Sequence, residues 1–333
     1  MEKGVSPLIA EIILIAVVFS IATAVIVVLG GVSFSVRTLD AKLGVDGFEW
    51  GSQKLVIHHL KGDVIREAFE TCGENFRWKD LVVKKTGREV EPLNLRFNGK
   101  RLGYLIYEDM TSAPSGTLKN QATYDPENRW VRLTPVGLGL YGELEYVLNP
   151  PPADFVVEFQ FWAGGGTGAD ATWFYAYCEN TPLLESSTNT GGYVFAYNEY
   201  QDRLELYYNG TLLYSVSKTG IDDGRWHDAR IVFDDRAIEM YIDNEYVSRL
   251  RYVDYQASSR KNKPLFGWGA REGLFTNEHR VRNLRMYHLK PQVHNFSPGD
   301  ILEFEIESPL VIGDAITISY LPQNKLLYMN DIS

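Results

Sequence analysis

The sequence contains only two cysteines, Cys72 and Cys178, among its 333 residues. Their separation fits neither a zinc-binding spacing nor a redox pair. Two interpretations of these cysteines remain: two unrelated buried thiols, or a single disulfide that forms in an oxidising exterior. The sequence shows no motif for a cofactor or a metal, and we expect the protein to use neither.

Positive charge is also scarce. Lysine and arginine total 33 against 43 acidic residues, which gives a net charge of -10 and a pI near 5.2. A protein that binds nucleic acid needs a basic patch to contact phosphates. The composition therefore argues against nucleic acid as a partner.

Helical periodicity is missing from the sequence after Arg37. Glycines instead separate short runs in which apolar and polar residues alternate, such as residues 54–60 and residues 301–306. Alternation of this kind is typical of half-buried strands separated by turns. Together with an aromatic content of 13%, it predicts a β-sandwich architecture for most of the chain.

The exception is one long apolar segment near the N-terminus. Residues 12–29 are almost all apolar, and only Ser20 and Thr23 interrupt them. A run of this length is long enough to cross the hydrocarbon of a membrane. Ser6 can cap a helix and Pro7 suits its first turn, so we expect one long apolar helix over residues 5–44.

Three interpretations of this segment compete. A cleaved secretory signal requires a shorter apolar core and a better cleavage site than residues 30–33 offer. An uncleaved membrane anchor is the second interpretation. The third depends on the four-residue leader that ends at Gly4 and is followed by Val5. This arrangement resembles the class III signal of archaeal type IV pilins, which implies cleavage between Gly4 and Val5 by a prepilin peptidase.

The same resemblance implies partners and a location for the chain. The segment would wait in the membrane and then be packed with copies of itself into an extracellular helical filament by a membrane assembly machinery. Ile12, Phe19 and Val25 would lie in the filament core. Glu11 is a carboxylate within the apolar zone, and such groups usually have a partner. The amine of Val5 on a neighbouring subunit is the candidate, although bacterial pilins carry their glutamate nearer to the new N-terminus.

The two ends of the remaining chain share a pattern of short alternating runs separated by turns. The turns at residues 297–300 and 313–314 separate alternating runs, and "LKGDVI" and "WKDLVVKKTGREV" occur near the start. These features resemble the headgroups of archaeal pilins and archaellins. The resemblance implies an immunoglobulin-like sandwich that is split between residues 45–103 and residues 291–333.

The stretch between these halves carries a second set of motifs. The turn and strand "DGRWH", the strand "YIDNEYV" and the ending "TNEHRVRNLRMY" resemble the concanavalin-like jelly roll of L-type lectins and laminin-G-like modules. The resemblance covers residues 104–290. In that fold the first and last strands lie side by side, so such a module can be inserted into a loop of the headgroup.

The lectin resemblance implies particular binding residues. Asp170, in an Ala-Asp step, would accept hydrogen bonds from sugar hydroxyls, and Gly191 or Gly192 would donate a backbone N–H. The step that holds the ordering metal in L-type lectins is replaced here by residues 196–198, Ala-Tyr-Asn. This departure argues against the usual metal and leaves a purely structural role for Asp170 as the alternative.

Other side chains have structural explanations. We expect His227 and His279 to be structural, because neither has a companion at ligand spacing. Exposed aromatic rings can stack on sugars, but a place in the core is the alternative for each of five candidates: Trp173, Tyr175, Tyr193, Tyr197 and Tyr200. Jelly-roll glycosidases carry a Glu-x-Asp-x-x-Glu motif, and its absence predicts that the protein is not an enzyme.

Two sequons, at Asn209 and Asn295, are candidate glycosylation sites on an extracellular surface. The predicted fold class is mainly β with one long N-terminal α-helix. Its domains are a leader (1–4), an apolar helix (5–44), a split headgroup (45–103 and 291–333) and an inserted jelly roll (104–290). We expect a filament subunit that displays a lectin-like domain for adhesion or glycan binding. The alternative is a membrane-anchored carbohydrate-binding protein that does not polymerise.

Overall fold

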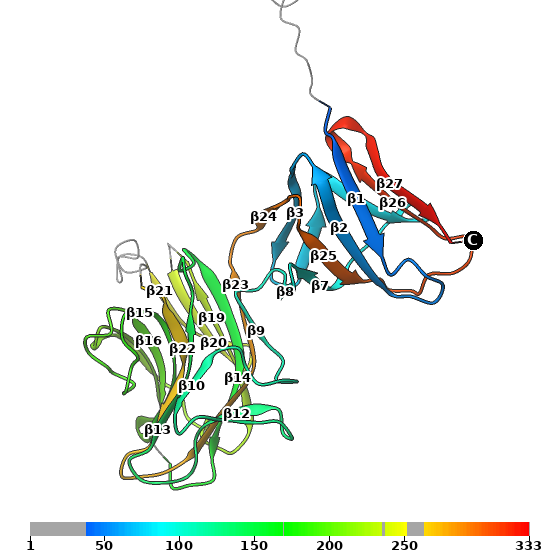
Figure 1. The fold of residues 1–333 in the computed structure, drawn as a ribbon. Coiled ribbons are helices and arrows are strands. Elements are labelled where there is room, and N and C mark those ends of the chain that lie inside the picture. The colour runs from blue at the N-terminus through cyan, green and yellow to red at the C-terminus, as the bar shows by residue number, and fades with distance from the viewer. Residues whose placement is uncertain (1–37, 169, 235–236, 252–262, 333) are drawn as a thin grey trace, which may run out of the picture. The chain divides into compact units, whose positions relative to one another are not determined.

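The computed structural model describes residues 38–168, 170–234, 237–251 and 263–332. Within these residues the backbone forms five antiparallel β-sheets (Figure 1). The strands fall into two sets. One set combines strands from both ends of the chain, and the other contains the strands between them.

The predicted fold class needs correction at its helix. Within the described residues the helical segments are short 3-10 turns, η1 (Glu199–Gln201) and η3 (Leu321–Gln323). The predicted helix over residues 5–44 is wrong at its C-terminal end, because strand β1 (Ala41–Asp46) begins within it. The backbone of β1 pairs with β2 (Lys54–Gly62), and the Leu43 side chain is buried. Glycines at positions 44 and 47 disfavour a helix here.

Residues 1–37 lie outside the described residues. The predicted cleavage site at Gly4 and Val5 therefore lies outside them, as do the predicted filament-core residues Glu11, Ile12, Phe19 and Val25. Among the helices that are described, none has the length and apolar character that crossing a membrane requires.

The first set of strands forms three sheets, with five, three and four strands. Their orders are β1-β2-β25-β7-β8, β24-β3-β4 and β27-β26-β5-β6. The remaining strands of these sheets are β3 (Ile65–Cys72), β4 (Asn75–Trp78), β5 (Leu81–Lys85), β6 (Arg88–Glu89), β7 (Leu93–Phe97), β8 (Lys100–Arg101), β24 (Gln292–Phe296), β25 (Ile301–Glu305), β26 (Ala315–Tyr320) and β27 (Lys325–Asp331).

Strands from the two ends of the chain are direct neighbours in each of these sheets. β2 pairs with β25, β3 with β24, and β5 with β26. In the first pair Leu55 lies opposite Phe304, and both side chains are buried. The alternation in residues 54–60 and 301–306 therefore marks the face of each strand that is turned toward the core.

The second set forms a seven-stranded sheet, β10-β13-β22-β15-β16-β17-β18, and an eight-stranded sheet, β11-β12-β23-β14-β19-β20-β21. The strands of the first sheet are β10 (Thr117–Asn120), β13 (Tyr141–Val147), β15 (Ala171–Cys178), β16 (Tyr193–Asn198), β17 (Arg203–Tyr208), β18 (Thr211–Ser217) and β22 (Leu265–Arg271). Those of the second are β11 (Thr123–Asp125), β12 (Trp130–Thr134), β14 (Phe155–Gly164), β19 (Trp226–Phe233), β20 (Ala237–Ile242), β21 (Glu245–Arg251) and β23 (Glu278–His288). The eighth strand of the second sheet, β9 (Ile106–Glu108), lies outside this order and pairs with β23.

The two larger sheets share one apolar core. Phe174 and Phe195 of the seven-stranded sheet belong to the same buried cluster as Phe155 and Phe233 of the eight-stranded sheet. Phe155 and Phe233 stack with their ring centroids 5.2 Å apart. Two antiparallel sheets that face each other across such a core form a sandwich. The concanavalin-like sandwich predicted for this stretch is thus confirmed.

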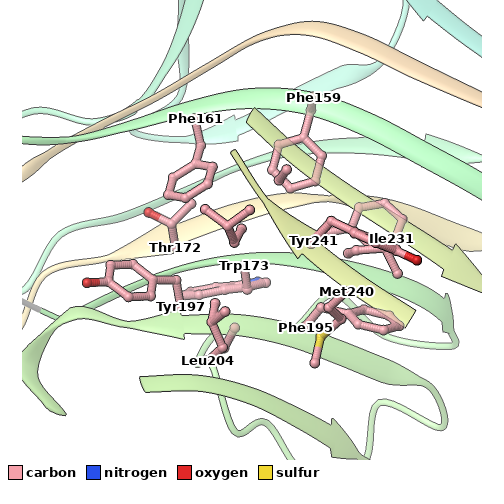
Figure 2. A pocket seen from close by; sticks show the side chains of 14 residues that line it. Phe159, Phe161, Thr172, Trp173, Phe195, Tyr197, Leu204, Ile231, Met240 and Tyr241 are labelled. Atoms are coloured by element: carbon pink, nitrogen blue, oxygen red, sulfur yellow. The ribbon is translucent and has the colours of Figure 1, made fainter. Parts of the chain in front are cut away.

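A small cavity of about 40 Å³ remains within this core. Figure 2 shows Phe159 and Phe161 on one side of it, with Leu204 and Met240 among the other side chains. The side chains that face it are almost all apolar and nearly all buried, so it is a packing defect between the sheets rather than a binding site.

Four of the five aromatic candidates for sugar stacking are buried. Trp173, Tyr175, Tyr193 and Tyr197 each expose less than 5% of their surface, so the alternative of a packed position is correct for them. Only Tyr200 is exposed, at 63%. Burial of these large side chains contributes to stability through the apolar area that they remove from water.

Candidate functional site

The predicted sugar-binding residues lie at opposite ends of two paired strands. Asp170 immediately precedes β15, whereas Gly191 and Gly192 precede β16, which runs antiparallel to β15. The eight residues of β15 separate them by roughly 26 Å at about 3.3 Å per residue. The structure therefore does not bring these residues together. Asp170 remains the candidate for the site.

Three backbone hydrogen bonds fix the position of Asp170. Its N–H donates to the carbonyl of Arg271 (3.2 Å), and its carbonyl accepts from the N–H groups of Glu199 (2.9 Å) and Tyr200 (3.4 Å). Its side chain lies against Gly273, where an added Cβ would be 2.1 Å from Oδ2. Only glycine leaves room for the carboxylate in this position.

The Asp170 carboxylate is partly shielded from water. Burial raises its pKa, the guanidinium of Arg271 lowers it, and the carboxylate of Glu199 raises it again. The Arg271 Nε atom is 3.9 Å from Oδ2, and the Asp170 side chain keeps 22% of its surface exposed. A shielded acceptor that still reaches the surface is suited to hydroxyl groups of a ligand.

Two exposed aromatic residues belong to the loops that contact Asp170. Tyr200 follows the residue that is bonded to Asp170, and its ring stacks on Phe275 at 5.6 Å with an interplanar angle of 26°. Phe275 is 45% exposed and Leu274 is 90% exposed. We refer to Asp170, Tyr200, Gly273, Leu274 and Phe275 as the loop-end patch.

A buried ionic network lies beside the loop-end patch. His279 contacts Glu199 through Nε2 (3.0 Å to Oε1) and Glu272 through Nδ1 (3.2 Å to Oε1). None of these three side chains is exposed. Burial alone would lower the pKa of His279, but the two carboxylates outweigh it and raise the pKa to about 9. The imidazole is therefore held as a cation between two anions.

The network joins the two loops that carry the patch. The Asn277 backbone N–H donates to Glu272 (2.6 Å), and its side-chain amide donates to Glu199 (2.7 Å). Thr172 of β15 donates to Glu199 as well, at 3.1 Å. Residues 199–201, residues 271–277 and the start of β15 are thus tied to one another through buried polar groups.

The carboxylates of this network are already engaged by His279. Within the described ranges no group of three or more His, Cys, Asp or Glu side chains is arranged to hold a metal ion. Glu199 and Glu272 already share the charge of His279, so they do not fit a calcium ion. Asn198, in the step that departs from the lectin pattern, instead accepts a hydrogen bond from the Gln201 N–H and caps η1.

Of the two interpretations of the cysteines, the disulfide does not describe the structure. Cys72 and Cys178 are both free. Cys72 ends β3, whereas Cys178 ends β15 within a buried cluster of the seven-stranded sheet. Burial raises the pKa of the Cys178 thiol to about 12, which keeps it protonated and unreactive. The interpretation of two separate thiols describes this arrangement.

The remaining predicted residues occupy structural or surface positions. His227 lies between Asp243 (2.8 Å) and Asp223 (3.2 Å) at the start of β19. Asn209 and Asn295 are exposed, and their side-chain oxygens accept backbone hydrogen bonds.

Gly273 and Phe275 were not predicted from the sequence. Their only signal is the segment Arg-Glu-Gly-Leu-Phe at residues 271–275, which follows a strongly apolar strand. Nothing in that segment reveals its proximity to Asp170, because the two are about 100 residues apart in the chain.

No protein-family model matches the chain, and no curated protein matches it. Among solved structures, the chain is similar to the exoplasmic/lumenal domain of VIP36 in its Ca²⁺-bound form, with a TM-score of 0.47 and 14% identity. That match covers 66% of this chain and 99% of the VIP36 chain. The carbohydrate recognition domain of Emp46p in its potassium-bound form is also similar, with a TM-score of 0.42, 14% identity, and coverage of 56% and 94%. VIP36 has been solved with Ca²⁺ and Man3GlcNAc bound.

Proposed function

We propose that residues 104–290 form a carbohydrate-binding module and that its ligand is a neutral glycan held by the loop-end patch. The observation that carries this proposal is the exposed Tyr200–Phe275 stack beside the fixed carboxylate of Asp170. An aromatic face packs against the apolar face of a sugar ring, and a carboxylate accepts hydrogen bonds from two sugar hydroxyls. The buried network of His279 supports this function by fixing both loops before a ligand arrives.

The proposal is for binding without cleavage. Glycosidases need two carboxylates that flank the scissile bond, and the loop-end patch offers only Asp170. We therefore expect a bound oligosaccharide to be released intact. The appearance of new reducing ends after long incubation with the purified protein would contradict this part.

Binding of immobilised glycans by the full chain, followed by calorimetry with the best ligand, tests the site. We expect Asp170→Asn to weaken binding about tenfold or more, because charge-assisted hydrogen bonds are replaced by weaker ones. Gly273→Ala should do the same while leaving the Asp170 side chain itself unchanged, because the added methyl group displaces the carboxylate. Tyr200→Ala should remove the stacking surface.

Tyr246→Ala is the matched control, since Tyr246 is 51% exposed but lies on β21 of the other sheet. If Tyr246→Ala weakens binding as much as Tyr200→Ala does, the loop-end patch is not the site.

For the whole chain we propose a membrane-anchored surface protein that presents this module outside the cell. The apolar run at residues 12–29 supports an anchor. The function as a filament subunit, with copies of itself, a prepilin peptidase and an assembly machinery as partners, stays a prediction. N-terminal sequencing of native protein tests it, because processing would make Val5 the first residue. A chain that keeps Met1 and forms no fibre on sheared cell surfaces would leave only the anchored protein.

A further inference from the structure

The outer face of the seven-stranded sheet carries a row of side chains that crosses the strands. Residues that lie directly opposite each other in neighbouring strands point to the same face. Successive pairs define one line across the sheet, which we call the transverse row: Lys119, Glu143, Gly269, Trp173, Ala196, Glu205 and Ser215. Their chain neighbours Leu144, Phe174 and Phe195 point into the core, so the transverse row points away from it.

Three side chains of the transverse row carry buried polar atoms without a hydrogen-bond partner among the described residues. They are Glu143 Oε1, Trp173 Nε1 and Ser215 Oγ. Glu143 and Trp173 each expose only 1% of their surface. An unpartnered buried group destabilises a fold, and native structures contain few of them. Three in one line across a sheet therefore call for a common explanation.

The unpartnered atoms include both kinds of hydrogen-bonding group. The indole N–H of Trp173 is a donor, Glu143 Oε1 is an acceptor, and the hydroxyl of Ser215 is either. The indole ring lies on the backbone of Gly269, where an added Cβ would be 2.5 Å from Nε1. Its N–H edge is therefore on the side of β22, the strand that lies between β15 and the strand of Glu143.

The surroundings of the transverse row suit a neutral ligand. Glu145 and Glu205 lie on the same face, and tyrosine hydroxyls donate to both, at 3.4 Å from Tyr175 and 2.8 Å from Tyr207. Lys119 is the cation of the transverse row and pairs with Glu145 at 2.7 Å. The face therefore keeps an excess of carboxylates, which disfavours acidic sugars. Sugar hydroxyls both donate and accept, and the aromatic floor suits sugar rings.

The length of the transverse row suits a short linear chain. Glu143 and Ser215 are separated by five steps between neighbouring strands, or about 24 Å at about 4.8 Å per step. Gly269 and Ala196, which flank Trp173 in the neighbouring strands, have small side chains and leave room for a ligand above the sheet. An oligosaccharide laid across the strands would reach all three unpartnered atoms.

A segment of the chain covers this face. Residues 179–190 form most of the connection between β15 and β16. Thr181 within the segment donates to Glu145 at 2.6 Å, which places it over the sheet. Glu185 lies over the same face: burial raises its pKa, and Arg271, Asp170 and Glu205 are its charged neighbours. The segment leaves Leu183 and Leu184 exposed, and Thr181 holds it to the sheet through a polar contact.

We propose that the transverse row is a second saccharide-binding site, which takes a neutral linear oligosaccharide once residues 179–190 move aside. The site uses residues other than those of the loop-end patch. The proposal can therefore be tested separately from the function proposed above. A ligand would supply the partners that Glu143, Trp173 and Ser215 lack. The closed segment keeps the site empty until a ligand competes with its contacts to Glu145.

The test opens the site in the full chain that also carries Asp170→Asn, so that the loop-end patch does not contribute. Residues 181–188 are replaced by two glycines. The backbones of Glu179 and Thr190 are hydrogen-bonded and can be joined by a tight turn. Calorimetry is carried out with cellohexaose, laminarihexaose and a linear mannohexaose. The shortened chain should bind at least one of them about tenfold more tightly than the full-length chain with Asp170→Asn does, because the closed state no longer competes.

Two variants of the shortened chain identify the residues. Ser215→Ala should weaken binding about 3- to 10-fold without lowering thermal stability, because its hydroxyl has no partner in the free protein. Gly269→Ala should abolish binding by placing a methyl group against Trp173. Ser217→Ala, two residues further along the same strand and exposed, is the matched control and should bind normally.

The proposal is overturned if the folded, shortened chain binds none of the three hexaoses at millimolar concentration. It is equally overturned if Ser215→Ala and Ser217→Ala bind with the same affinity. If Asp170→Asn abolishes glycan binding by the full-length chain but the shortened chain still binds a hexaose, both sites are supported. If the full-length chain shows no binding at the loop-end patch and the shortened chain binds a hexaose, only the transverse row is supported.

Discussion

Replacement of His279 by glutamine is expected to remove a pH-dependent part of the stability of the larger sandwich. His279 is completely buried between Glu199 and Glu272 and is held there as a cation. Glutamine keeps some hydrogen bonding but brings no charge. Removing one partner from a buried ionic group commonly costs about 3–5 kcal/mol, because the carboxylates that remain lose their counter-charge.

The pH dependence follows from the pKa of His279. It is raised to about 9 in the folded protein from 6.5 in the unfolded chain. The gap, at about 1.4 kcal/mol per pH unit, corresponds to about 3 kcal/mol. Because the folded pKa is raised, this contribution is fully present below about pH 6.5 and is lost as the pH rises through about 9. His279→Gln should lack this decline.

Urea unfolding of the full chain between pH 6 and pH 9.5, followed by tryptophan fluorescence, measures the effect. Most tryptophans report on this sandwich, since Trp130, Trp162, Trp173, Trp226 and Trp268 lie within it. His288→Gln is the control. Burial lowers the pKa of His288, so this histidine is neutral in both states above about pH 7.5 and its removal should leave the slope unchanged there.

Two outcomes would refute the reasoning about His279. One is a wild-type stability that stays constant from pH 6.5 to pH 9.5. The other is a His279→Gln protein that is destabilised by the same amount at every pH, since that would mean that packing rather than charge is lost.

Two further predictions concern the same sandwich. Leu204→Ala enlarges the core cavity and should lower the free energy of unfolding by about 2–5 kcal/mol in denaturant titrations. Ala229→Val partly fills the cavity and should raise that free energy by about 1 kcal/mol. Equal losses of stability from the two substitutions would contradict the cavity. Burial raises the pKa of Glu143 from 4.5 to about 7, so its protonated form stabilises the fold below pH 4.5 and this contribution disappears as the pH rises through 7. Glu143→Gln should match the wild type at pH 4 and exceed its stability at pH 8 by up to about 3 kcal/mol, and a lower stability at pH 8 would show that the carboxylate is needed ionised.

Strands with one buried face could be predicted from the sequence because alternation records that face directly. Residues 301–306 alternate strictly, and β25 spans Ile301–Glu305. The pattern is less informative where both faces of a strand are covered. In β15 every residue is buried, so its pattern does not distinguish Trp173, on the outer face, from Phe174 in the core.

The candidate sites depended on contacts that alternation does not record. The resemblance to lectins identified Asp170, but it paired Asp170 with glycines at the far end of β15. The transverse row draws on seven strands whose register is set by bulges and turns, such as the shift after Tyr175. The buried charge of Glu199 was equally hidden, because an acidic residue after an apolar strand usually indicates a solvent-exposed turn.

The pairing of β9 with β23 determines how the larger sandwich responds to a pulling force. The antiparallel partners Ile106 and Met286 lie at the entrance and exit of the larger sandwich. A pull that separates these two ends would load the hydrogen bonds between β9 and β23 one after another, which is the geometry of a zipper and yields at low force. Strand β9 has only three residues, so it would peel away first and lengthen the tether. The remaining strands of the two sheets would bear the tension only afterwards.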